Sequence, residues 1–345
     1  MPCSQGAPPV SHSPGRTKVA LITLDGQSLP DAVVQELAQA GVDLSVSECT
    51  NRADLAAHAA DADVVWLFGG SRVLHDGNLA ALDRCWAILR TGSGTDNVPV
   101  DEATARGILV ANTPAAFSDG VSDHVIGLLF TVVRRLAALD RSMRAGRWEQ
   151  ATAVPLNSVE GRTLGLVGFG HVGQLLVRKL RGFEMRVLAH DPYARPGTLA
   201  SHGVEPADLG RVFSESDFVS LHCPLTPETH HLVGEAQLRL MKPSAILINT
   251  ARGPVVNEPA LIRALQEGRL AAAGLDVFES EPPAADNPLL KMDNVVVTPH
   301  GAGYSVNGVE LRWRHSIAAL AALAARRWPP SCVNRQVRPR VELSL

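Results

Sequence analysis

The first third of the chain alternates short apolar runs with segments of helical spacing. Apolar runs typical of buried strands occupy 19–22, 63–68, 87–89 and 108–110, and residues 31–40 predict a helix. Strands that alternate with helices form a parallel sheet with helices on its faces. We therefore expect the first part of the chain to form a parallel α/β domain.

The same alternation returns after residue 161 and predicts a second parallel sheet, of six strands. The strands are expected at 164–167, 186–189, 218–221, 245–248, 271–275 and 295–297. The last four are followed by polar or unusual residues, among them Cys223, Arg252, Asp276 and His300. Ligands of open α/β sheets bind at the carboxyl ends of the strands, so we expect these four endings to face one crevice.

The most specific motif follows the strand at 164–167. Gly168, Gly170 and Gly173 have the spacing G-x-G-x-x-G, and a helical pattern begins there. The first glycine permits a tight turn, the second lets backbone amides approach a pyrophosphate, and the third lets the helix pack on the strand. Asp191 ends the next strand, 18 residues after Gly173, where a carboxylate accepts ribose hydroxyls and repels a 2′-phosphate. The stretch predicts a dinucleotide site that prefers NAD.

Two longer helices and a proline suggest how the domains are joined. Residues 122–144 are interpreted as one helix, whose apolar first half needs cover from the nucleotide domain and from a second copy of the chain. Pro114 biases Thr113 towards an extended conformation and marks a hinge. A helix at 305–326 has no face left on the second sheet, so we expect it to return to the first domain.

Composition narrows the classes of partner. The 345 residues include 32 Lys and Arg against 35 Asp and Glu, a net charge of −3 without blocks of like charge, which indicates neither a nucleic-acid nor a membrane surface. Five scattered cysteines without a C-x-x-C pair predict reduced thiols, no metal site and a cytoplasmic protein. Residues 1–16 are rich in proline and lack the apolar centre of a signal peptide, so we expect a disordered tail.

Three side chains near the expected crevice have the chemistry of a dehydrogenase. Arg252 offers a planar fork of donors that fits a carboxylate and a neighbouring carbonyl oxygen. His300 is a proton carrier near neutral pH, and Glu281 would orient its imidazole and favour its charged form. Taken singly, each residue could be structural. Together they indicate hydride transfer at C2 of a 2-hydroxy or 2-oxo acid.

A glycine-rich loop in the first domain is a candidate for binding the substrate carboxylate. Gly92, Ser93 and Gly94 follow the strand at 87–89, and their successive amides could form an anion nest. The loop could equally be a plain turn in which Asp96 caps the next helix. Local sequence leaves both interpretations open.

The chain resembles the D-isomer-specific 2-hydroxyacid dehydrogenase family from Val19 to Val337. The motifs that show the resemblance are RTGSGTDNV at 90–98, GLVGFGHVGQ at 165–174, LHCPLTPETHHLV at 221–233, LINTARGPVVNEPAL at 247–261, AGLDVFESEPP at 273–283 and VTPHGAGY at 297–304. Where relatives have Val-Ala-Glu-His, this chain has Ser122 and Asp123 at the two middle positions, and Gly301 replaces a common Ile.

The resemblance implies roles for individual residues. Arg252, Glu281 and His300 are expected to be catalytic, and Arg252 is expected to bind the substrate together with Gly92, Ser93 and Gly94. Asp276 is expected to approach the nicotinamide amide. The expected cofactor contacts are Gly168, Phe169, Gly170, His171, Val172, Gly173, Asp191, Cys223, Pro224, Thr229, Thr250, Ala251, Arg252, Asp276, His300 and Gly303. The family is typically dimeric through the region of the long helix, so we expect a homodimer.

The expected fold is two doubly wound parallel-sheet α/β domains. A Rossmann NAD-binding domain at 114–302 is inserted into a discontinuous, flavodoxin-like substrate domain at 17–113 and 303–337. The expected activity is NAD-dependent hydride transfer to or from C2 of a small D-2-hydroxy or 2-oxo acid. Two alternatives are a D-3-phosphoglycerate dehydrogenase, although only Arg72 stands near the place of its Arg-Ser-x-Thr element, and an NAD-sensing corepressor-like protein.

Overall fold

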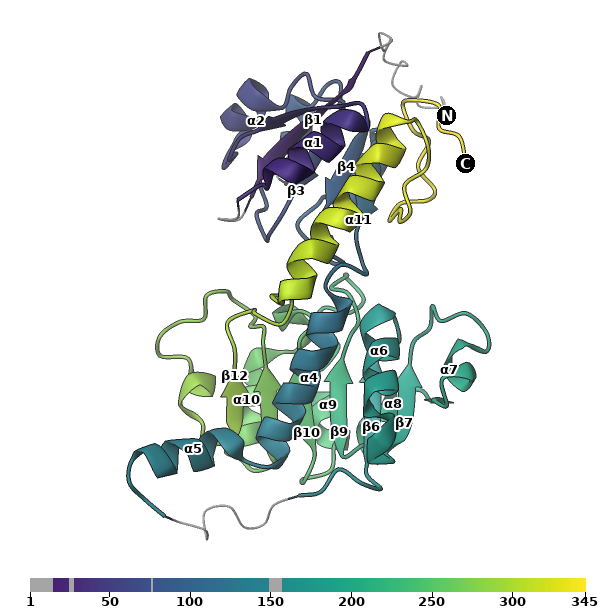
Figure 1. The fold of residues 1–345 in the computed structure, drawn as a ribbon. Helices are drawn as coiled ribbons and strands as arrows, with labels where there is room; N and C mark the ends of the chain where they lie inside the picture. The colour runs from purple at the N-terminus through teal and green to yellow at the C-terminus, as the bar shows by residue number, and fades with distance from the viewer. Residues whose placement is uncertain (1–14, 25–27, 76, 149–156) are drawn as a thin grey trace, which may run out of the picture. The chain divides into compact units, whose positions relative to one another are not determined.

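The computed structural model describes residues 15–24, 28–75, 77–148 and 157–345, and the chain forms two compact units (Figure 1). Unit 1 comprises Met1–Phe117 and Val306–Leu345, and unit 2 comprises Ser118–Ser305. The tail expected at 1–16 lies outside the described residues apart from Gly15 and Arg16. In the described ranges, no helix combines the length and apolar character that a membrane span requires.

Unit 1 is built on a parallel sheet which, in the described part of the chain, has five strands in the order β2-β1-β3-β4-β5. The strands are β1 (Thr17–Thr23), β2 (Val42–Val46), β3 (Val64–Leu67), β4 (Ala87–Arg90) and β5 (Leu109–Asn112). The helices are α1 (Asp31–Gln39), α2 (Arg52–His58), α3 (Val100–Ala105) and α11 (Val306–Ala324). The predicted parallel α/β architecture is confirmed.

Alternating side chains of the unit 1 strands fill two cores. Val19 and Leu21 on β1 belong to the core beneath α1 and α11, whereas Ala20 and Ile22 belong to the core beneath α2. Each fully buried Val, Leu or Ile side chain contributes about 1.5–3 kcal/mol. On α11, Trp313 meets Trp66 of β3 edge to face at 6.0 Å, so the C-terminal helix completes the same core as the N-terminal strands.

Unit 2 is built on a parallel sheet whose described strands follow the order β12-β11-β10-β9-β6-β7-β8. They are β6 (Thr163–Val167), β7 (Arg186–His190), β8 (Glu205–Pro206), β9 (Phe218–Leu221), β10 (Ile246–Asn249), β11 (Ala272–Leu275) and β12 (Val295–Val297). The chain passes from β6 outward to β7 and then returns to place β9 on the other side of β6. A ligand crevice is expected at such a switch point, at the carboxyl ends of β6 and β9.

Helices cover both faces of the unit 2 sheet (Figure 1). One face packs against α4 (Ser118–Val133) and α6 (His171–Leu180), and the other against α8 (Leu209–Glu215), α9 (Glu235–Leu240) and α10 (Glu258–Gln266). The remaining helices of the unit are the short α7 (Thr198–Ser201) and α5 (Leu136–Arg144).

Three sequence-based element predictions were wrong. The single helix expected at 122–144 is two helices, because Arg135 adopts a left-handed conformation with φ of 52° and ends the hydrogen-bond ladder of α4. The second sheet has a seventh strand, β8, which is only two residues long and too short for a periodic pattern. The edge strand β2 was also not anticipated, because its outer residues are largely exposed.

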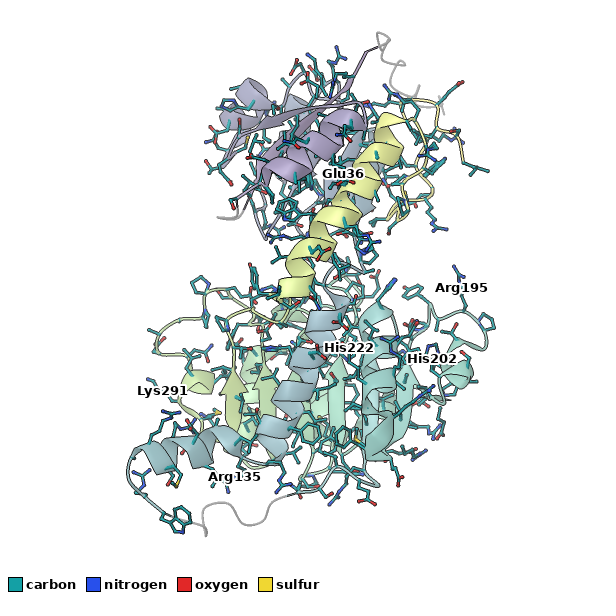
Figure 2. The ribbon with its side chains drawn as sticks, in the orientation of Figure 1. Glu36, Arg135, Arg195, His202, His222 and Lys291 are labelled. Carbon is teal, nitrogen blue, oxygen red and sulfur yellow. The ribbon has the colours of Figure 1, made fainter. Side chains whose placement is uncertain are left out.

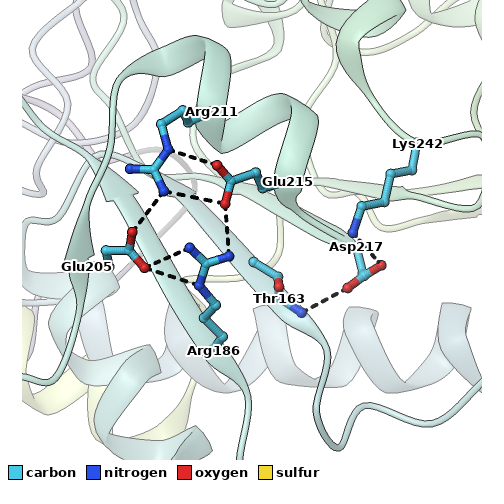
Figure 3. A network of polar contacts seen from close by, with 7 residues as sticks. All are labelled: Thr163, Arg186, Glu205, Arg211, Glu215, Asp217 and Lys242. Carbon is cyan, nitrogen blue, oxygen red and sulfur yellow. Dashed lines mark hydrogen bonds and ion pairs between the residues drawn. The ribbon is translucent and has the colours of Figure 1, made fainter.

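The outer edge of the unit 2 sheet is closed by a ring of alternating charges (Figure 3). Arg186 of β7 pairs with Glu205 of β8 and with Glu215 of α8, and Arg211 of α8 pairs with the same two carboxylates. Exposed pairs of this kind contribute little singly, but a charged edge strand resists pairing with another chain.

Candidate active site

The glycine turn of unit 2 has the geometry that a dinucleotide site requires. Gly168 follows β6 with φ of 94°, and a Cβ there would lie 2.8 Å from the backbone of His222 and Cys223. Gly173 sits inside α6, where a Cβ would lie 3.1 Å from the carbonyl oxygen of Gly168. A Cβ on Gly170 would meet no atom within 4 Å. The first and third glycines therefore serve packing, and the second leaves room beside the free amides of α6 for a pyrophosphate.

Asp191 lies immediately after β7 and faces the same turn. One carboxylate oxygen accepts the Phe169 amide at 2.7 Å, and the other accepts the Tyr193 amide at 2.9 Å. A hollow of about 270 Å³ lies beside Asp191 and is lined by residues of β7, of α7 and of the loop between them, including Pro192 and Leu199. The carboxylate is thus fixed by backbone donors, with open space next to it for an adenosine.

Two buried polar atoms at neighbouring strand ends have no hydrogen-bond partner within the described residues. His222 follows β9 (Figure 2), and its Nε2 is enclosed; Thr250 follows β10, and its Oγ1 is enclosed. Burial lowers the pKa of His222 to about 4, so its ring is neutral at physiological pH. Buried polar groups in proteins are normally paired, so these two fit a site that receives a polar ligand.

His300 and Glu281 form a close pair. His300 Nδ1 lies 2.6 Å from Glu281 Oε2, and the other carboxylate oxygen accepts the Phe278 amide at 3.0 Å. Burial raises the pKa of Glu281, but the hydrogen bonds from His300 and Phe278 and the charges of His300 and Arg252 outweigh it, so the pKa lies below its usual value. The imidazole is about half exposed, and its Nε2 points away from the pair. That nitrogen is free to exchange a proton with a bound acid.

Arg252 follows β10, and its segment packs directly against the segment that contains Phe278 and Glu281. A Cβ on Gly253 would lie only 1.7 Å from the Phe278 carbonyl oxygen, so the two backbones touch where only glycine fits. Asn249 holds the Arg252 carbonyl at 2.9 Å, and one guanidinium nitrogen donates to Ala251 O at 2.7 Å. The structure therefore brings all three predicted catalytic residues to one end of the unit 2 sheet.

A second histidine–glutamate pair lies in the same unit and must be distinguished from the first. His231 Nε2 lies 2.6 Å from Glu279 Oε1. Asn257 caps α10 by accepting the Ala260 amide with its oxygen, so its NH₂ group faces His231 Nδ1 at 3.2 Å. Among the described residues, both ring nitrogens of His231 have a hydrogen-bond partner, whereas His300 has one at Nδ1 only. Geometry favours His300 as the proton carrier and His231 as a structural residue.

Three further predicted cofactor contacts, Thr229, Cys223 and Asp276, are hydrogen-bonded or shielded by the protein itself. Thr229 Oγ1 donates to the Pro224 carbonyl at 2.6 Å and shapes the loop after β9. Burial raises the pKa of Cys223 to about 11, and the charge of Asp191 adds to the effect, so the thiol is protonated. Asp276 is 1% exposed, and both of its oxygens already accept protein donors.

The glycine-rich loop of unit 1 is more constrained than its sequence indicated. The Gly92 amide donates to Thr113 Oγ1 at 2.7 Å, and Asn112 donates to the Ser93 carbonyl at 2.8 Å. Gly92 has φ of 118°, and a Cβ there would overlap the Arg90 guanidinium. The Gly92 amide is therefore already used, and the amides left for an anion are those of Ser93 and Gly94.

Sequence reasoning missed several residues that shape this site. Gly253 packs against Phe278, and His231, which pairs with Glu279, donates its amide to Pro254 O just after Arg252. His124 and Thr298 are hydrogen-bonded to each other, and Thr298 is hydrogen-bonded to Asp276. Thr298 stands in the quoted motif VTPHGAGY, but its role depends on a neighbour 174 residues away in the chain, which no local pattern reveals.

A larger hollow of about 430 Å³ lies between the end of α4 and residues 157–160 and 182–184. None of the predicted catalytic or cofactor residues lines it, so it does not belong to the active site. The described residues contain no group of three side chains that could hold a metal ion.

Comparison with known proteins agrees with this geometry. Residues 126–302 match the model of the D-isomer specific 2-hydroxyacid dehydrogenase NAD binding domain. Glyoxylate reductase of Korarchaeum cryptofilum is 46% identical over 248 residues, which are 71% of this chain and 74% of that protein. D-3-phosphoglycerate dehydrogenase of Methanocaldococcus jannaschii is 41% identical over 241 residues, but these make up only 45% of that protein.

The fold has close structural counterparts as well. The crystal structure of a glyoxylate reductase from Paecilomyes thermophila superimposes with a TM-score of 0.85 at 26% identity, covering 94% of this chain and all of that one. The chain belongs to the D-isomer-specific 2-hydroxyacid dehydrogenases and is an NAD-dependent oxidoreductase of hydroxy and oxo acids.

Proposed function

We propose that this enzyme uses NADH to reduce small 2-oxo acids such as glyoxylate to the corresponding 2-hydroxy acids, and that it catalyses the reverse oxidation. Where C2 of the product is a stereocentre, the product has the D configuration. The observation that carries the proposal is the His300–Glu281 pair, which leaves one imidazole nitrogen for a substrate beside Arg252. A glyoxylate reductase that is 46% identical over 248 residues supports the small, unphosphorylated class of substrate.

In this mechanism each catalytic side chain has one task. Arg252 binds the substrate carboxylate and polarises the adjacent carbonyl with its fork of donors. When bound in unit 2, NADH would supply the hydride that reduces C2. His300 donates the Nε2 proton to the carbonyl oxygen, which becomes the hydroxyl, and Glu281 stabilises the imidazolium before that transfer.

The cofactor is held in unit 2. Gly170, His171 and Val172 bring backbone amides to the pyrophosphate, and Asp191 accepts the ribose hydroxyls. A fixed carboxylate at that place repels a 2′-phosphate, which favours NAD over NADP. His222 and Thr250 supply polar atoms to the same end of the sheet.

We assign unit 1 as the substrate domain, in which the Ser93 and Gly94 amides contribute to binding the carboxylate.

We also propose a homodimer formed through the region of α4 and α5, because Leu136, Met143 and Trp148 are exposed large apolar side chains there. The described cysteines are free thiols, which suits a reducing cytoplasm. Light scattering of the purified protein tests the dimer.

The deciding experiment is a steady-state assay with NADH and a panel of glyoxylate, hydroxypyruvate, phenylpyruvate, 2-oxoglutarate and 3-phosphohydroxypyruvate. We expect the highest kcat/KM among the small unphosphorylated acids. A preference for the phosphorylated acid would favour a phosphoglycerate dehydrogenase. Tight NADH binding without turnover of any acid would contradict the proposal and favour an NAD sensor.

A further inference from the structure

The backbone of His300 is held in a strained conformation. Its φ is 49°, in the left-handed region that non-glycine residues rarely adopt. Such a conformation persists only where surrounding contacts impose it, and it often marks a functional site. The contacts that impose it here converge on Asp276.

Asp276 acts as an anion bound by the His300 turn. Its carboxylate accepts the Gly301 amide at 2.8 Å and the Ala302 amide at 2.9 Å, and its carbonyl accepts the His300 amide at 2.8 Å. The left-handed conformation of His300 turns the next two amides towards the buried carboxylate, as in an anion nest. The position of the imidazole thus depends on the position of Asp276.

Asp276 is in turn held by a chain of two side chains from other elements. Thr298 Oγ1 donates to Asp276 Oδ1 at 2.5 Å, because an ionised carboxylate can only accept. The Thr298 oxygen must then accept from His124 Nε2, which lies 2.9 Å away. The same nitrogen is 3.5 Å from Asp276 Oδ1, so His124 lies beside the buried carboxylate as well as beside Thr298.

Close packing of α4 places His124 at this point. A Cβ on Gly274 of β11 would lie 3.2 Å from Leu128 Cβ, so the absence of a side chain on the strand allows the helix to approach it. Leu128 is one helical turn after His124, and β11 ends one residue before Asp276. The helix therefore delivers the His124 ring to the carboxyl end of β11.

We propose that His124 and Thr298 are positioning residues for catalysis, which act through Asp276 to hold His300 in register with Glu281. The proposal rests on the proposed function, in which His300 transfers the proton. His124 and Thr298 do not touch the substrate in this scheme. They fix the geometry of the group that does, so their loss should lower kcat more than it weakens cofactor binding.

Variants at both positions test the proposal. Thr298→Val removes the hydroxyl that links His124 to Asp276 with little change in side-chain volume. His124→Leu removes the imidazole that donates to Thr298. We expect each to lower kcat by about 10- to 100-fold with the KM for NADH within about twofold of wild type. Thr298→Ser and His124→Gln restore a donor at nearly the same place and should recover most of kcat.

Ser122→Ala is the matched control. Ser122 is a buried residue of α4 whose hydroxyl donates to the Asp119 carbonyl of the same helix, away from Asp276. It should leave kcat unchanged. NADH titration by fluorescence confirms that each variant is folded.

The outcomes separate this proposal from the one it rests on. If Thr298→Val and His124→Leu bind NADH and turn over at the wild-type rate while His300→Ala is inactive, the positioning role is wrong and the proposed function stands. If His300→Ala remains active, the proposed function itself is wrong. If Thr298→Val does not fold, equal kcat in His124→Leu and His124→Gln still overturns the positioning role.

Discussion

At His300 the two ring nitrogens have different surroundings. Nδ1 is bound to Glu281, which sets the orientation of the ring, and in the proposed mechanism Nε2 meets the substrate. His231 has the same partner type at the same distance, but Asn257 engages its second nitrogen. Among the described residues, the two histidines therefore differ in one hydrogen-bond partner, which is the reason for proposing His300 as the proton carrier.

His300→Ala should abolish reduction while preserving the affinity for NADH. A general acid contributes about 10²- to 10⁴-fold to the rate, and the pyrophosphate site lies on a different segment. Stopped-flow reduction of the best panel substrate and NADH titration measure the two effects. His231→Gln serves as the comparison and should keep kcat within a few fold. A His300→Ala enzyme with wild-type kcat contradicts the assignment.

Glu281→Gln should change the pH profile of reduction on its acid side. The hydrogen bonds from His300 and Phe278 and the charges of His300 and Arg252 hold the pKa of Glu281 below its usual value, so the wild-type carboxylate keeps its charge until the pH falls through that lowered pKa. The glutamine does not titrate, so the acid limb that Glu281 contributes should be absent from the profile of the variant. The measurement is log kcat/KM against pH for both enzymes, and superimposable profiles would exclude Glu281 from the mechanism.

Asp191→Ala should weaken NADH binding by about tenfold or more while leaving NADPH binding unchanged or improved. A hydrogen bond to a charged group contributes about 1.5–3 kcal/mol, and the repulsion of the 2′-phosphate disappears with the carboxylate. Isothermal titration with both cofactors checks this. Equal losses for NADH and NADPH would mean that Asp191 does not contact the ribose.

At the scale of elements, the site depends on backbones that approach one another where a glycine allows it. Gly253 lets the loop after β10 touch the loop after β11, and Gly168 lets the turn after β6 touch the end of β9. These contacts bring Arg252, Glu281 and the cofactor turn to one end of the sheet. The sheet supplies the direction of the loops, and the glycines set their separation.

Gly253→Ala should separate Arg252 from Glu281 and lower both stability and kcat. The new methyl overlaps the Phe278 carbonyl, so one loop must shift. Overpacking costs about 1–3 kcal/mol, which corresponds to a fall in Tm of about 5 °C for a domain of this size. Gly182→Ala is the matched control, because its methyl would meet no atom within 4 Å. Calorimetry and steady-state kinetics that show the same values for both variants would refute this account.

Across the molecule, the features that could be predicted from the sequence are those encoded in a few consecutive residues. The buried strands of both sheets and the glycine turn are encoded in runs of a few residues, and they were identified at nearly their observed bounds. The break at Arg135 was missed because the left-handed conformation of one arginine has no signature in an otherwise helical stretch. The support of His300 by Asp276 and His124 was missed because it joins three elements that are distant in the chain.

At the same scale, stability in acid should depend on His222. Burial lowers its pKa from 6.5 to about 4, so between these values the unfolded chain binds a proton that the folded chain excludes. The contribution is intact above pH 6.5 and is lost as the pH falls, by about 2 kcal/mol between pH 7 and 5 and about 3 kcal/mol by pH 4. His222→Gln removes the titrating group. As the pH is lowered, the free energy of unfolding of this variant, measured with urea, should therefore fall less steeply than that of wild type.

The control is His230→Gln, at an exposed histidine eight residues further along the chain, which should follow wild type. Parallel curves for wild type and His222→Gln would show that the ring is charged in the folded protein and that the strand end around it is open to water.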